Sequence, residues 1–154
     1  MHWRNITHEA LEALADSPVL FVRGARQVGK STLAKDLLAD EFPAKYVTLD
    51  NATNLASALD DPTEFIASQP RPVIIDEIQR APGLLLAIKE TIDKDRKPGQ
   101  FLLTGSANLL TLPMVNESLA GRMEILTLWP LSQGEVQGRK ADFIATLFEG
   151  GLAR

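Results

Sequence analysis

The chain has 154 residues, of which 45% are hydrophobic and 23% charged, and its net charge is −4. This composition excludes extensive disorder, and the length allows one domain that buries about 68 to 70% of its unfolded surface. With no cysteine, the sequence excludes disulfides and thiolate metal sites, and its charge lacks the strongly basic footprint of a nucleic-acid-binding protein. No signal-peptide pattern and no apolar run near 18 residues is visible, so we expect a cytoplasmic protein with no membrane contact.

The first predicted elements are a helix, a strand and a second helix. Thr7 is the expected cap of the first helix, which carries Leu11 and Leu14 and ends at residues 16–18. The apolar run Val19 to Val22 predicts a strand. Leucines at positions 33, 37 and 38 predict a helix over Thr32 to Ala39.

Four further apolar runs, each near proline, glycine or aspartate, predict strands. They are Tyr46 to Leu49, Val73 to Ile75, Phe101 to Leu103 and Ile125 to Trp129. Leu84, Ile88 and Ile92 recur every four residues, which predicts an amphipathic helix, and residues 132–135 form a capping box for a last helix. Strands that alternate with helices predict an α/β fold, with a mainly parallel sheet covered on both faces.

Residues 24–31 read Gly-Ala-Arg-Gln-Val-Gly-Lys-Ser, a complete phosphate-binding loop between a predicted strand and a predicted helix. The two glycines let the backbone curl so that consecutive N–H groups face the phosphates at a helix N-terminus. Lys30 is placed to reach the β- and γ-phosphates, and the Ser31 hydroxyl is the expected Mg²⁺ ligand. The residues expected to bind nucleotide are Gly24, Ala25, Arg26, Gln27, Val28, Gly29, Lys30, Ser31 and Thr32.

An acidic pair, Asp76-Glu77, follows the buried strand that begins at Val73. An isolated pair of this kind is more often a helix N-cap followed by a solvated charge. After a phosphate loop we favour functional roles, with Asp76 holding Mg²⁺ directly or through water and Glu77 deprotonating the attacking water. A base in that place favours hydrolysis, so an ATPase is preferred to a kinase.

The next predicted strand ends in a polar segment, Thr104-Gly105-Ser106. A hydroxyl at that strand end is placed to hydrogen-bond the attacking water or the γ-phosphate, and so to sense an intact nucleotide. Thr104 is the first candidate and Ser106 the second. The alternative is a β-branched strand residue followed by an ordinary Gly-Ser turn.

Five segments in this order resemble the N-terminal AAA-type ATPase domain of a large, poorly characterised prokaryotic family of ATP-binding proteins. They are residues 24–31, 74–79, 102–106, 118–122 and 130–135. The resemblance covers about residues 1–154. It implies a three-layer P-loop NTPase fold with five parallel strands in the order 5-1-4-3-2, and ATP and Mg²⁺ as cofactors.

The resemblance also implies a role for Arg122, which precedes the fifth strand. It would reach the nucleotide of a neighbouring subunit, where an arginine finger is worth about 10³ to 10⁵ in rate. The alternative is a surface arginine that closes a helix. A finger of this kind implies a homo-oligomer or a protein partner.

Family members usually continue into a C-terminal domain of unknown function, and this sequence ends at Arg154. We therefore expect a single ATPase domain over residues 1–154, without a helical lid or C-terminal domain. Its early end favours a second hypothesis, a nucleotide-gated binding or regulatory module with negligible turnover. A small P-loop kinase is the third hypothesis, and direct binding of nucleic acid, which the charge does not indicate, is the fourth.

Overall fold

Five parallel strands form one sheet in the computed structural model, which describes residues 6–25, 27–37 and 40–130. The strands are β1 (Val19–Arg23), β2 (Lys45–Thr48), β3 (Val73–Asp76), β4 (Phe101–Gly105) and β5 (Met123–Thr127). Their order across the sheet is β2-β3-β4-β1-β5, which is the predicted order read from the opposite edge. The predicted fold is therefore confirmed, with β4 lying between β1 and β3.

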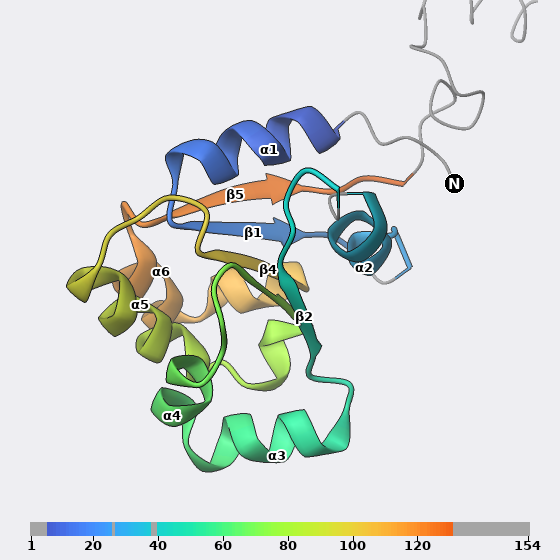
Figure 1. Cartoon of the computed structure of the whole chain (residues 1–154). Helices are drawn as coiled ribbons and strands as arrows, with labels where there is room; N and C mark the ends of the chain where they lie inside the picture. The colour runs from blue at the N-terminus through green and yellow to red at the C-terminus, as the bar shows by residue number, and fades with distance from the viewer. Residues whose placement is uncertain (1–5, 26, 38–39, 131–154) are drawn as a thin grey trace, which may run out of the picture.

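Helices cover both faces of the sheet (Figure 1). One face carries α1 (Ile6–Asp16) and α2 (Lys30–Thr32), which continues as a π-helical segment (Leu33–Leu37). The other face carries α3 (Ala52–Asp60), α4 (Pro62–Ala67), α5 (Leu84–Lys94) and α6 (Pro113–Leu119). Two short 3₁₀ turns, η2 (Ile78–Arg80) and η3 (Ala107–Thr111), follow β3 and β4.

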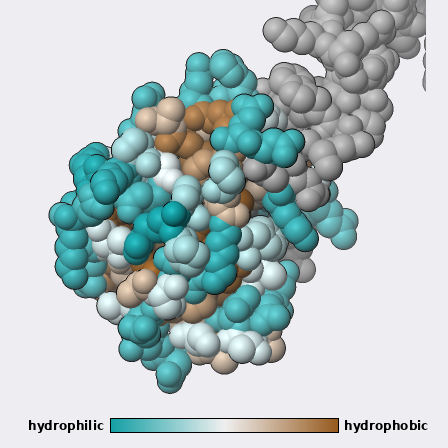
Figure 2. Space-filling view, in the orientation of Figure 1, coloured by the Kyte–Doolittle hydropathy of each residue, from teal (hydrophilic) through white to brown (hydrophobic). Residues whose placement is uncertain are grey.

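Alternation along the strands divides the hydrophobic core into two clusters. Val19 and Phe21 of β1 pack in the cluster under α3 to α6, whereas Leu20 and Val22 pack in the cluster under α1 and α2. Successive side chains of a strand point to opposite faces, so a strand covered on both sides is apolar throughout. Figure 2 shows the complementary surface, where hydrophilic side chains predominate and hydrophobic residues emerge in patches between them.

Several predicted boundaries differ from those of the structure. Thr7 is the second residue of α1, not its cap, and its buried hydroxyl has no hydrogen-bond partner among the described residues. Strand β5 begins at Met123 and ends at Thr127, two residues earlier than predicted at each end. The capping box at 132–135 lies outside the described residues. In the described part of the chain, every helix is too short or too polar to cross a lipid bilayer.

Three helices, α3, α4 and α6, have no predicted counterpart, and the first two have clear caps. The Asn51 side chain accepts a hydrogen bond from the Asn54 N–H at 3.0 Å and begins α3. The Asp61 side chain does the same for the Glu64 N–H at 3.0 Å, with Pro62 in the first turn of α4. Each cap satisfies an N–H group that the first helical turn leaves without a partner.

Candidate functional site

A cleft of about 820 Å³ opens where the strands end, because parallel strands bring their carboxyl ends to one edge of the sheet. Its described lining joins the phosphate-loop segment, a residue two positions beyond the end of β2, and the segment that follows β3. The lining residues are Gln27, Gly29, Lys30, Ser31, Thr32, Asp50, Glu77, Gln79 and Arg80. The structure therefore brings together the two motifs that the sequence analysis linked.

The loop between β1 and α2 has the backbone that a phosphate-binding loop requires. Gln27 and Gly29 both adopt left-handed conformations, with φ of 64° and 93°. A Cβ at Gly24 would lie 2.7 Å from the Leu128 carbonyl oxygen, so only glycine allows that close approach. Arg26, the remaining candidate of this loop, lies outside the described residues.

Lys30 is the first residue of α2 and is only 7% exposed. Its ammonium group donates to the carbonyl oxygens of Gly24 at 3.1 Å and Ala25 at 2.8 Å. These contacts hold the charge beneath the loop, at the wall of the cleft. Carbonyl oxygens are weaker partners than phosphate oxygens, so an incoming phosphate can draw the ammonium group from them.

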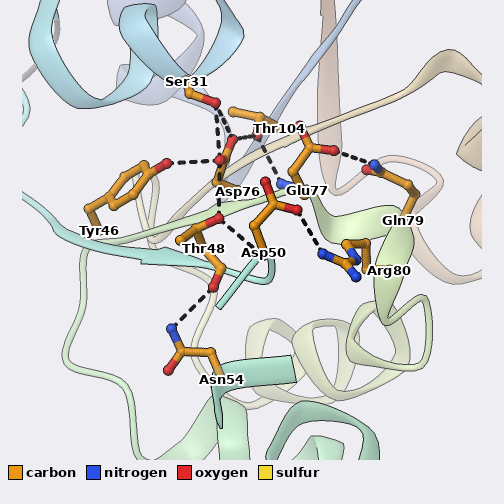
Figure 3. A network of polar contacts seen from close by, with 10 residues as sticks. All are labelled: Ser31, Tyr46, Thr48, Asp50, Asn54, Asp76, Glu77, Gln79, Arg80 and Thr104. Atoms are coloured by element: carbon orange, nitrogen blue, oxygen red, sulfur yellow. Dashed lines mark hydrogen bonds and ion pairs between the residues drawn. The ribbon is translucent and has the colours of Figure 1, made fainter. Parts of the chain in front are cut away.

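Asp76 is the centre of a polar network and is only 3% exposed (Figure 3). Four hydroxyl groups from three other elements converge on its carboxylate. They are Ser31 at 2.9 and 3.0 Å, Tyr46 at 2.8 Å, Thr48 at 3.3 Å and Thr104. A buried carboxylate is stable only when its oxygens are satisfied in this way.

Tyr46 and Thr48 were not among the site residues predicted from the sequence, although the strand pattern contains a signal for them. Side chains two apart on a strand share a face, so Tyr46 and Thr48 of β2 point to the same side as Asp76 of β3 and Thr104 of β4. Burial, and then the hydrogen bond to Asp76, raise the pKa of Tyr46 to about 12. The phenol therefore remains a proton donor to Asp76.

Glu77 directly follows β3 and has a left-handed backbone, with φ of 62° and ψ of 44°. Its N–H donates to the Thr104 hydroxyl at 3.2 Å, and its carboxylate accepts a hydrogen bond from the Gln79 amide. A non-glycine residue in this conformation is uncommon and is often found at functional sites. Glu77 and Gln79 both line the cleft.

An ion pair forms the rim of the cleft beside Glu77. The Arg80 guanidinium lies 2.7 Å from the Asp50 carboxylate, which follows β2. Both side chains are substantially exposed, at 42% and 65%. Neither was a leading candidate from the sequence, because no motif marks an exposed pair brought together by the ends of two strands.

Three sequence candidates, Thr104, Ser106 and Arg122, are not among the described residues that line the cleft. Thr104 is fully buried and holds Asp76 and Glu77, so its contact with water or phosphate stays a prediction. Ser106 follows Gly105, and its N–H faces the Gln79 side-chain oxygen at 3.4 Å. Arg122 directly precedes β5, at the end of the sheet opposite the cleft, and its guanidinium lies 2.7 Å from the Asp93 carboxylate.

The oxygen ligands at the cleft suit a hard divalent cation. The Ser31 hydroxyl and the Asp76 carboxylate are adjacent, and oxygen is the ligand that Mg²⁺ prefers. Across the described residues, no cluster of three or more histidine and carboxylate side chains has a metal-binding arrangement. Such an ion is typically held by one or two protein groups, with substrate phosphates and water completing the shell.

Comparisons with known proteins agree with this geometry. A family model described as "AAA domain" matches residues 16–137. Two uncharacterized proteins, one from Mycobacterium bovis and one from Mycobacterium tuberculosis, are each 34% identical to the chain over 140 residues. These matches cover 91% of this chain but only 31% of each relative, so the chain spans about a third of their length.

Two solved structures share the fold. A Walker-type ATPase of Pyrococcus abyssi superposes with a TM-score of 0.57 and 19% identity, over 88% of this chain and 55% of that one. A DNA replication initiation factor superposes with a TM-score of 0.53 and 15% identity, over 80% of this chain and 44% of that one. At these levels of identity, the similarity shows a shared fold alone.

Proposed function

The chain belongs to the AAA domain family, and on that premise we propose that it binds ATP with Mg²⁺ in the cleft and hydrolyses it. The observation that carries the proposal is the pairing of Ser31 with Asp76 beside Lys30 and Glu77. A plain phosphate-binding loop needs neither a buried carboxylate hydrogen-bonded to its serine nor an acidic residue that lines the cleft. Together they provide an oxygen site for a cation and a base for water.

The loop amides and Lys30 bind the β- and γ-phosphates in this proposal. Lys30 leaves the carbonyl oxygens of Gly24 and Ala25 for the stronger phosphate acceptors. Ser31 and Asp76 hold the Mg²⁺, which neutralises charge on the phosphate oxygens when bound. Tyr46, Thr48 and Thr104 keep the Asp76 carboxylate in place.

Glu77 acts as the base. It accepts a proton from water as the water oxygen bonds to the γ-phosphorus, while the bond from that phosphorus to the β–γ bridging oxygen breaks. The bridging oxygen keeps the electron pair, so the products are ADP and inorganic phosphate. The left-handed backbone at Glu77 turns the chain out of β3 and directs the side chain to the cleft.

A nucleotide-gated binding module with negligible turnover is the second candidate. For a chain that acts alone, the position of Arg122 supports this candidate, because the arginine precedes β5, at the end of the sheet opposite the chain's own cleft. The chain's own Arg122 then does not stabilise the negative charge on the transferred phosphoryl group. Binding would change the loops around Glu77 and Thr104 without rapid release of phosphate.

Two variants test the proposal, with Mg·ATP affinity measured by calorimetry and turnover by phosphate release. Lys30→Ala should abolish nucleotide binding, whereas Lys94→Ala, at the end of α5, should leave it unchanged. Glu77→Gln should keep binding and lose hydrolysis by about 10² to 10⁴, the usual contribution of a general base. Equal hydrolysis by Glu77→Gln and the parent would refute the base assignment, and tight binding without release would support the second candidate.

A further inference from the structure

The Gln79 side chain joins the candidate base to the end of β4. We propose that Gln79 is a positioning residue that fixes the Glu77 carboxylate for attack by water. This inference rests on the proposed hydrolysis and adds to it a residue of η2 whose side chain is hydrogen-bonded to Glu77 and Ser106. The Asp-Glu motif by itself gives the Gln79 carboxamide no role.

The Gln79 carboxamide makes two hydrogen bonds of opposite sense. Its Nε2 donates to Glu77 Oε2, and its Oε1 accepts from the Ser106 N–H at 3.4 Å. Only one orientation of the amide satisfies both partners, because a carboxylate requires a donor and a backbone N–H requires an acceptor. A glutamate has the same shape, but when ionised it would offer only acceptors.

Gly105, the last residue of β4, leaves the space that the amide occupies. A Cβ at this position would lie 2.7 Å from Gln79 Oε1, and 3.2 Å from side-chain atoms of Ile78 and Phe21. The φ of Gly105 is outside the left-handed region, so the backbone conformation does not call for glycine. Glycine is favoured there because a Cβ would lie so close to the Gln79 side-chain oxygen.

The residues at the end of β4 thus hold both the backbone N–H and the side-chain carboxylate of Glu77. Thr104 accepts from its N–H, and Ser106 anchors the Gln79 amide that holds its carboxylate. Without the amide, the flexible side chain of Glu77 could adopt other rotamers in the open cleft. A base that must meet a water within hydrogen-bond reach depends strongly on such orientation.

The test separates turnover from nucleotide binding. Gln79→Ala should lower kcat by about tenfold or more, since orientation contributes heavily to proton transfer, and should leave the Kd for Mg·ATP within about twofold. Gln79→Glu should also lower kcat, although the side chain keeps its shape. Circular dichroism and thermal unfolding confirm that each variant is folded.

Gly105→Ala provides a second, independent route to the same contact. In the parent it should lower kcat, because the added methyl group displaces the amide oxygen. In the Gln79→Ala background it should cost much less, since the group that it displaces is gone. An equal loss in both backgrounds would show that the methyl group acts on Ile78 or Phe21, and would overturn the proposal.

A nucleotide-free measurement keeps the contact testable apart from hydrolysis. The ¹⁵N–¹H side-chain resonance of Gln79, assigned by its disappearance in Gln79→Ala, should move in Glu77→Ala and stay in Lys94→Ala. If the parent releases no phosphate, the proposed hydrolysis fails, and this resonance decides the contact alone. The positioning role is overturned by an unmoved resonance, by parental kcat in Gln79→Ala, or by parallel losses of kcat and affinity.

Discussion

Asp76 combines near-complete burial with four hydroxyl donors. Hydroxyl groups satisfy the carboxylate without placing a permanent positive charge beside it. None of these hydroxyl groups brings a positive charge that would repel a bound cation. Of the four donors, Ser31 alone also lines the cleft, so it is the donor that can turn from the carboxylate toward a bound ion.

Tyr46→Phe tests this network at a single atom. Loss of a hydrogen bond to a charged group should lower the free energy of unfolding by about 1.5 to 3 kcal/mol at pH 8, measured in urea. Loss of this support should also weaken Mg²⁺ binding. Unchanged stability and unchanged Mg²⁺ affinity would show that the phenol is incidental.

The pH dependence of stability gives a matched comparison of the parent with Tyr46→Phe. The pKa of Tyr46 rises from 10.0 to about 12 in the folded chain, so the neutral phenol is favoured by folding. Its contribution is therefore complete below pH 10 and is lost as the pH rises toward 12. The stability difference between parent and Tyr46→Phe should shrink over that window, and a constant difference would contradict the prediction.

At the level of elements, apolar runs and loop chemistry made much of the fold predictable. The buried strands β1, β3 and β4 are apolar over nearly their full length, as strands covered on both faces must be. The edge strand β5 has partly exposed residues, including Ile125 at 41%, so its pattern was weaker and its ends were misplaced. Helices α3 and α4 bury few residues, and only their caps marked them.

The candidate site was predictable to the extent that motifs carry it. The phosphate loop and the Asp-Glu pair have fixed spacing along the chain. Tyr46 and Gln79 have no such spacing. Tyr46 lies 30 residues from its partner Asp76, and Gln79 lies 27 residues from its partner Ser106. Contacts of that kind depend on which strands are neighbours in the sheet, which the loop motif does not specify.

Asp61→Ala tests the cap that joins α3 to α4. The Asp61 carboxylate accepts from the Glu64 N–H, so its removal leaves a first-turn donor without a partner. We expect a loss of about 1 kcal/mol in the free energy of unfolding, measured in urea. Asp60→Ala is the matched control, because this exposed neighbour caps neither helix and should change stability little.

Across the whole molecule, the cleft and Arg122 lie at opposite ends of the parallel strands. The cleft is at the carboxyl ends of the strands, whereas Arg122 immediately precedes β5. A strand of five residues spans about 16 Å at a rise near 3.3 Å per residue. An arginine at that end does not serve its own cleft, so any role in turnover requires a second copy of the chain.

Mixing two inactive variants tests that role. Glu77→Gln lacks the proposed base but keeps Arg122, and Arg122→Ala has the reverse defect. If Arg122 acts on a neighbouring cleft, each variant alone should be slow, by up to about 10³ to 10⁵ for the arginine. The mixture should then regain activity, because an intact Arg122 faces an intact cleft at some interfaces, and the rate per subunit should rise with protein concentration. A mixture that shows only the sum of the separate rates, together with a parental rate independent of concentration, would leave Arg122 with a structural role, in its contacts with Asp93 and the Ala120 carbonyl oxygen.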